Sequence, residues 1–192
     1  MLRKSLGILL LAAAAPAVAD DISYNFVDLG YQRIEIDDVA GIDVDGDGFG
    51  IAGSFEIAEN WFVQASYAQA DFDFGVDFDQ TALGVGYKTG ISDRSDVFAT
   101  VNYLRAEVSA SGLGSADDDG FGISVGVRAM LSDTFELNGS IGYVDFDDGG
   151  DSTSVSAGGL FNLTETFALG LGIEVDDDVT SYGILGRIYF GN

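Results

Sequence analysis

The chain has 192 residues, of which 32 are acidic and 8 are basic, and its formal net charge at pH 7 is −24. This balance excludes nucleic acid as a partner, because phosphate backbones are bound by clustered Lys and Arg side chains. The chain has no cysteine, which excludes disulfides and thiol chemistry, and it is 47% hydrophobic, so its apolar and acidic residues must be segregated on folding.

Residues 1–19 have the features of a cleaved signal peptide. Arg3 and Lys4 give a positive start, residues 6–15 form an apolar core, and residues 17–19 form a small-x-small cleavage site. The alternative is an N-terminal membrane anchor, which needs a longer apolar run of about 18 residues or more. The sequence therefore predicts export, followed by cleavage after residue 19.

Residues 20–192 read as one domain in which apolar and polar residues alternate. Alternation with a period of two predicts strands with one apolar face. The clearest case is residues 121–143, where two alternating halves flank a turn at 132–134 and predict an antiparallel hairpin. Ten strands are predicted in all, at residues 23–33, 48–58, 61–70, 80–88, 96–108, 121–131, 135–143, 153–163, 167–175 and 180–190.

The connections between these strands alternate between short turns and segments rich in aspartate. The acidic segments, predicted as loops, are residues 34–47, 71–79, 109–120, 145–151 and 176–178. In an up-and-down membrane barrel all short turns lie at one end and all long loops at the other. With both chain ends in the periplasm, the aspartates face the outside of the cell.

The second face of the strands distinguishes a membrane barrel from a soluble sandwich. It consists mostly of Gly, Ser and Ala with isolated charges, which suits a narrow lumen better than a solvated surface. The predicted lumen charges are Glu56, Lys88, Arg105, Arg128, Glu136, Glu174 and Arg187. Aromatic residues gather near both ends of the strands, as the two interfaces of a bilayer require. The predicted fold is all-β, a closed antiparallel up-and-down transmembrane β-barrel of ten strands, with eight strands as the alternative.

The sharpest local motif is Asp43-Val44-Asp45-Gly46-Asp47-Gly48. Spaced carboxylates followed by glycine open the calcium loop of an EF-hand. The position that should hold a bidentate Glu is Ser54, and the flanking residues read as strand, so the segment is not an EF-hand. It is either a solvated turn or a weak site for Ca²⁺ or another divalent cation held by Asp43, Asp45 and Asp47, which could bridge to lipopolysaccharide phosphates. No other cofactor is expected.

The hairpin repeats resemble the small outer-membrane β-barrel proteins of Gram-negative bacteria. The final Gly186-x-Ile188-x-Phe190 is similar to the C-terminal signal read by the barrel-assembly machinery, although Gly191 and Asn192 follow it. A narrower resemblance joins Ser23-Tyr24-Asn25-Phe26-Val27 and Gly30-Tyr31 to the opening strand of a porin-like subfamily linked to diffusible-signal regulation in plant-associated gammaproteobacteria. The resemblance implies an outer-membrane location, with lipid and lipopolysaccharide as partners.

The lumen residues and the acidic segments allow two functions, and neither is catalytic. Small barrels that are enzymes use histidine with aspartate or serine, and this chain has no histidine. The first function is porin-like passive passage of small solutes or cations through a narrow lumen behind an acidic mouth. The alternative is a non-conducting structural or surface-interaction barrel. An open lumen at Arg128, Arg187, Glu56 and Glu136 favours the first, and pairing of those groups favours the second.

Overall fold

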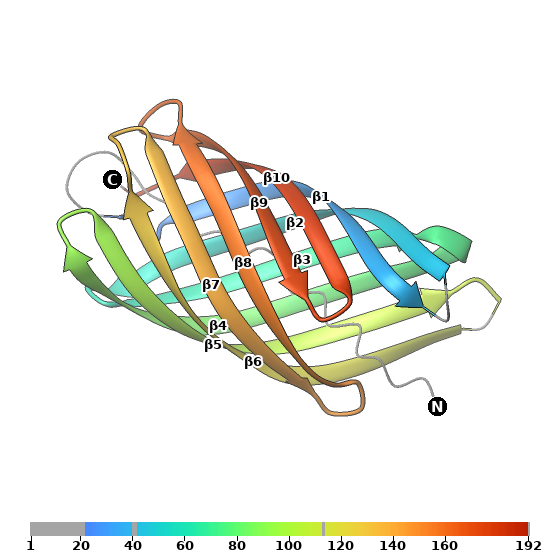
Figure 1. Ribbon diagram of the computed structural model, residues 1–192. Coiled ribbons are helices and arrows are strands. Elements are labelled where there is room, and N and C mark those ends of the chain that lie inside the picture. The colour runs from blue at the N-terminus through green and yellow to red at the C-terminus, as the bar shows by residue number, and fades with distance from the viewer. Residues whose placement is uncertain (1–21, 40–41, 113, 192) are drawn as a thin grey trace.

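The computed structural model describes residues 22–39, 42–112 and 114–191, which form one closed barrel of antiparallel strands (Figure 1). Each strand pairs with its neighbours in sequence, and β1 pairs with β10 to close the ring. The strands are β1 (Phe26–Val39), β2 (Ile42–Ala58), β3 (Trp61–Phe72), β4 (Val76–Ser92), β5 (Ser95–Ala110), β6 (Gly114–Met130), β7 (Phe135–Phe146), β8 (Gly150–Asn162), β9 (Phe167–Asp176) and β10 (Val179–Tyr189), with a short 3₁₀ helix, η1 (Asp73–Gly75), between β3 and β4. The ten-stranded prediction is confirmed and the eight-stranded alternative is wrong. Among the described residues, no helix is long and apolar enough to cross a membrane.

The two ends of the barrel are made by different connections, which we name for use below. The turn end holds both ends of the described chain and the connections 59–60, 93–94, 131–134 and 163–166. At the hairpin end β1 is followed by β2, β3 by β4, β5 by β6, β7 by β8 and β9 by β10. This arrangement is the up-and-down topology expected from the sequence.

The acidic segments are largely strand and not loop, which corrects the sequence-based prediction. β1 continues to Val39 and β2 begins at Ile42, so most of the predicted loop 34–47 is paired sheet. The physical reason is that the alternation continues through the aspartates: Asp45 and Asp47 are exposed, whereas Gly46 and Gly48, which alternate with them, are buried. An aspartate-rich segment can therefore be a strand when every second residue is small or apolar.

The extended strands make one side of the barrel taller than the other. β2, β4 and β6 have 17 residues each, whereas β9 has 10 and β10 has 11. At ~3.3 Å per residue and a tilt of ~40°, a 17-residue strand rises about 43 Å, against the ~25 Å apolar band of an outer-membrane barrel. Figure 1 shows the β9–β10 hairpin ending well short of the β1–β2 and β5–β6 hairpins.

The outer face carries a wide apolar belt with an aromatic girdle near each end. Trp61 packs edge-on against Tyr87 near the turn end, with 5.1 Å between ring centroids, and Tyr103 packs against Phe121 nearer the hairpin end at 5.6 Å. The hydroxyl of Tyr103 donates to Asp119 at 2.7 Å. Rings that face lipid and polar groups that reach water are typical of a bilayer interface.

Phenylalanine rings fill the space that glycines leave on the inner face. Phe62 lies opposite Gly86 on the next strand, and Phe98 lies opposite Gly126. A Cβ built on Gly126 would lie 2.4 Å from the Phe98 ring and 2.7 Å from the carbonyl oxygen of Gly139. These glycines therefore make room for inward-facing rings instead of leaving the lumen empty.

Replacing Gly126 with alanine should destabilise the barrel by about 1–3 kcal/mol, because the new methyl group overlaps a ring and a fixed backbone oxygen. Gly183→Ala is the matched control, since its Cβ would come no closer than 3.7 Å to another atom. Urea unfolding of the refolded proteins measures both changes. Equal midpoints for the two variants would contradict the packing described here.

Candidate functional site in the barrel lumen

Six of the seven predicted lumen charges face the interior, and Arg105 does not. Arg105 lies on the outer face of β5, where its side chain is 56% exposed and pairs with Asp117 at 2.7 Å. Its place in the lumen was therefore a wrong prediction. The cause is parity: the inward residues of β5 are Leu104 and Ala106, on either side of it. The inward charges are Glu56, Lys88, Arg128, Glu136, Glu174 and Arg187.

Five of these six charges form ion pairs near the turn end. Arg128 Nε donates to Glu136 Oε1 at 2.9 Å, and neither side chain has any exposed surface. Lys88 Nζ lies 2.7 Å from Glu56 Oε1.

The fifth, Arg187, pairs with a carboxylate outside the predicted set. It donates to Asp28 through two nitrogens, at 2.5 Å and 2.6 Å, in the planar fork that guanidinium and carboxylate groups favour. The charges thus cross-link strands around the lumen and leave no open ring of charge at this level.

The described residues before β1 enter the same region of the lumen. Ile22 and Tyr24 are buried and pack in one cluster with Phe62 and Phe98. Two cations lie close to the Tyr24 ring, with Lys88 Nζ at 4.6 Å and Arg128 Cζ at 4.2 Å from its centroid. Such cation–π contacts gain strength when the groups are withdrawn from water.

Main-chain hydrogen bonds hold this N-terminal segment, residues 22–25, in place. The amide of Tyr24 donates to Glu56 Oε1 at 2.9 Å, and Arg128 donates to the carbonyl of Ser23 at 3.4 Å. The amide of Glu56 donates to Asn25 Oδ1 at 2.8 Å. Arg128 belongs to β6, which lies opposite β1 in the ring of ten strands, so the segment reaches across the lumen.

At the hairpin end an apolar cluster packs inside the barrel. Its buried members come from six strands around the ring: Ile34, Ile36, Ala70, Phe72, Phe78, Leu104, Ala106, Val144, Phe146 and Val179. A packed apolar interior gives water and ions no polar partner. The two ends of the lumen are therefore filled by different side chains. Ion pairs and aromatic rings fill the turn end, and aliphatic and aromatic groups fill the hairpin end.

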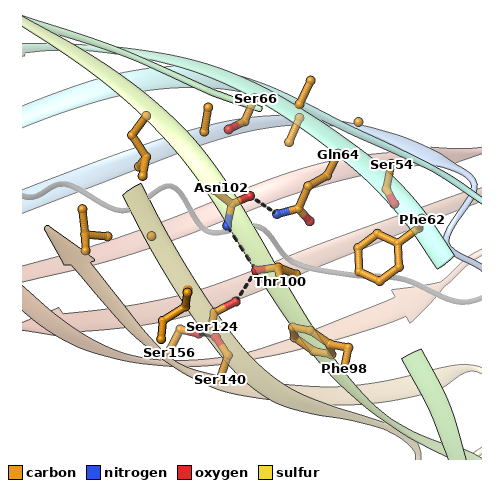
Figure 2. A pocket seen from close by; sticks show the side chains of 18 of the residues that line it. Ser54, Phe62, Gln64, Ser66, Phe98, Thr100, Asn102, Ser124, Ser140 and Ser156 are labelled. Atoms are coloured by element: carbon orange, nitrogen blue, oxygen red, sulfur yellow. Dashed lines mark hydrogen bonds between the residues drawn. The ribbon is translucent and has the colours of Figure 1, made fainter. Parts of the chain in front are cut away.

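A void remains between these two layers (Figure 2). It offers about 80 Å³ to the centres of water molecules, and a single water needs roughly 10–15 Å³ by that measure. Its polar lining includes Gln64, Thr100, Asn102, Ser124, Ser140 and Ser156. Figure 2 shows the chain of hydrogen bonds from Gln64 through Asn102 and Thr100 to Ser124, with lengths of 2.6, 3.1 and 2.6 Å.

The predicted divalent-cation motif does not form a loop. Asp43, Asp45 and Asp47 lie along β2, where a strand cannot wrap its carboxylates around one ion. The carboxylate of Asp45 is paired with Arg33 at 2.7 Å, and the side chain of Asp43 lies outside the described residues. Within the described part of the chain, no group of three acidic, histidine or cysteine side chains could hold a metal ion. The segment is therefore strand and not the predicted turn, and the weak divalent-cation site at Asp43, Asp45 and Asp47 stays a prediction.

Sequence reasoning missed Asp28 and the N-terminal segment. Asp28 shares its face with Phe26 on the first strand, so the alternation could have placed it inward, but its partner Arg187 is 159 residues away. Tyr24 continues the same inward alternation and falls within the predicted strand 23–33, whereas β1 begins only at Phe26. The predicted signal peptide, residues 1–19, lies outside the described residues.

Replacing Glu136 with glutamine should cost about 3–5 kcal/mol of stability, because it leaves the guanidinium of Arg128 buried without its counter-charge. Asp117→Asn breaks the exposed pair with Arg105 and should cost about 0–1 kcal/mol. Urea midpoints of the refolded proteins check the contrast. A Glu136 variant as stable as the Asp117 variant would show that the inner pair is not desolvated.

Comparison with known proteins agrees with this architecture. No curated protein has a sequence that matches this chain. An outer membrane channel from Pseudomonas putida F1 is similar in structure, with a TM-score of 0.59 and 9% identity over 90% of this chain and all (100%) of the other. The translocator domain of the autotransporter NalP from Neisseria meningitidis has a TM-score of 0.55 and 11% identity over 90% of this chain and 91% of its own. Residues 5–162 match the family model described as outer membrane protein beta-barrel domain; the chain belongs to this family of outer-membrane β-barrels.

Proposed function

We propose that this protein is a non-catalytic outer-membrane barrel that does not conduct in its resting state. In this proposal the turn end faces the periplasm and the hairpin end faces outward. The observation that carries it is the closure of the turn end, where buried ion pairs and the N-terminal segment occupy the lumen together. In this proposal the wall of the barrel is similar to that of a porin, but its lumen is closed.

Energetics favour the closed state. Opening a water-filled path at the turn end requires Tyr24 to leave the Lys88 and Arg128 side chains and requires Ile22 to leave its apolar cluster. At the hairpin end the path would have to part the cluster around Phe78 and Leu104. Burial of each large apolar side chain is worth about 1.5–3 kcal/mol, so spontaneous opening of both ends together is rare.

Passage of small solutes or cations is a second candidate, and one observation favours it. The wall of the barrel does not itself close the turn end; much of the closure comes from residues 22–25, which lie before the first strand. A void with polar lining already lies behind them. Withdrawal of this segment would join that void to the periplasm, which would make the segment a gate.

The surroundings of the barrel follow from its outer face. We propose that the apolar belt contacts outer-membrane lipid, that the exposed aspartates above it meet lipopolysaccharide, and that the ending at Phe190 is read by the barrel-assembly machinery. Residues 1–19 would direct export before cleavage. Two tyrosine–aspartate pairs lie in the girdle nearer the hairpin end, Tyr103 with Asp119 and Tyr67 with Asp79. Such pairs suit the boundary between the apolar belt and polar head groups.

Conductance of the refolded mature chain in a planar bilayer tests the proposal. The wild-type protein should be silent while its electrophoretic mobility shift on heating shows that it is folded. Steady open steps of the wild type would overturn the resting-closed proposal.

Removal of the N-terminal segment tests the second candidate. A chain that begins at Phe26, and separately Tyr24→Ser, should show cation-selective openings if the segment is a gate. Tyr31→Ser is the matched control, because Tyr31 lies on the outer face. Silence of both gate variants in folded form would reject passage and leave the non-conducting barrel.

A further inference from the structure

The inner wall of the barrel changes chemistry from one side to the other. Nearer the turn end, β8, β9 and β10 carry Arg187 and the buried apolar residues Leu160, Ala168 and Tyr189. Toward the hairpin end the same three strands present serines and carboxylates to the lumen, whereas most of the apolar cluster comes from β1 to β7. The polar residues of this wall are Ser152, Ser154, Ser156, Glu174, Asp176 and Ser181. An acidic wall therefore extends from the hairpin end toward the central void.

Of the six inward charges named above, Glu174 is the one that forms no ion pair. Only 5% of its surface is exposed. The other buried carboxylates farther down the lumen, Glu136 and Asp28, each hold an arginine. Among the described residues no Lys or Arg pairs with Glu174, and its only charged neighbour of note is Asp176, another carboxylate on the same face.

Glu174 also borders the void. It is one of the lining residues, together with Ser156, which is its register partner on β8. On its other side its register partner is Ser181 of β10. The Ser156 hydroxyl lies 2.7 Å from that of Ser140, and each hydroxyl oxygen has two lone pairs for a further partner. The site thus brings one carboxylate and several neutral oxygens to a space large enough for water.

A carboxylate buried without a partner is costly, and buried charges in proteins are paired or bind an ion. We propose that the lumen binds a small monovalent cation at Glu174, with the remaining ligands supplied by serine hydroxyls and by water in the void. Divalent ions fit less well, because Ca²⁺ takes six to eight oxygens, with several carboxylates among them, and Mg²⁺ demands near-octahedral geometry. The inference goes beyond the proposed function, since it concerns occupancy of the lumen and not conduction.

In this proposal the cation reaches Glu174 from the hairpin end of the barrel. Asp176 lies two residues beyond Glu174 at the end of β9, and its Oδ1 is buried with no hydrogen-bond partner among the described residues. β9 and β10 are the short strands of the barrel, so this acidic wall begins closest to the membrane band. A cation that enters along this wall, beside the apolar cluster, meets Asp176 first and Glu174 second.

Stability measured in different salts at constant ionic strength tests the proposal on the whole refolded protein. Urea unfolding is compared in NaCl, KCl, NH₄Cl and choline chloride, because the methyl groups of choline keep oxygen ligands away from its charge while it contributes the same ionic strength. At a cation concentration ten times its dissociation constant, the ratio of folded to unfolded protein should rise on the order of tenfold over choline. The three small cations distinguish which ion the site prefers.

Glu174→Gln removes the charge and keeps the shape. This variant should lose the cation dependence, and in choline it should be more stable than the wild type, because no unpaired charge is buried. Glu107→Gln is the matched control, since Glu107 is exposed on the outer face of β5, and it should keep the wild-type dependence. Identical salt responses of Glu174→Gln and the wild type would overturn the proposal.

Two further measurements keep the test decisive if the variant folds poorly. A crystal of the wild type grown in RbCl should show anomalous density beside the Glu174 carboxylate. An infrared band of a protonated carboxyl group that persists in KCl, and that Glu174→Gln removes, would show that a proton and not a cation neutralises this group. Either absence of the density or presence of that band would reject the site. Neither result bears on conductance, so failure here is distinct from failure of the resting-closed proposal.

Discussion

The central constraint on this protein is the cost of placing charge inside a narrow barrel. Ten strands leave a lumen in which Arg128 and Glu136 have no exposed surface, so each must find its counter-charge within the wall. Removing one partner of such a pair is far more costly than replacing both, which couples the strands that carry them. The ion pairs near the turn end therefore tie together the strands that carry them: β2 with β4, β6 with β7, and β1 with β10.

The N-terminal segment depends on the same charges. Lys88 and Arg128 both contact the ring of Tyr24, and Glu56 accepts a hydrogen bond from the Tyr24 amide while it pairs with Lys88. The charged side chains that could have lined a pore thus hold the N-terminal segment in the lumen. Phenylalanine rings beside Gly86 and Gly126 likewise fill space that the sequence alone suggests is open.

The sequence was informative wherever a local period decides the outcome. Alternation identified the ten strands, the lipid-facing belt and the inward parity of Arg128, Glu136 and Arg187. It failed for Arg105, because near the hairpin end the outer face also carries charge, and it failed for the acidic segments, because composition was given more weight than period. The pairing of Asp28 with Arg187 depends on closure of the barrel, which no local pattern reports. The path of residues 22–25 across the lumen was hidden for a similar reason, since Ile22 and Tyr24 continue the strand alternation.

A closed turn end requires the N-terminal segment to be part of the folded interior. Amide hydrogen exchange of Tyr24, measured by NMR on the refolded mature barrel, tests this most directly, because that amide donates to a half-buried carboxylate inside the lumen. The account predicts that Tyr24 exchanges as slowly as the amides of β1. Exchange at the rate of an unstructured chain, with the β1 amides protected, would show that the segment lies outside the lumen and that the turn end is open.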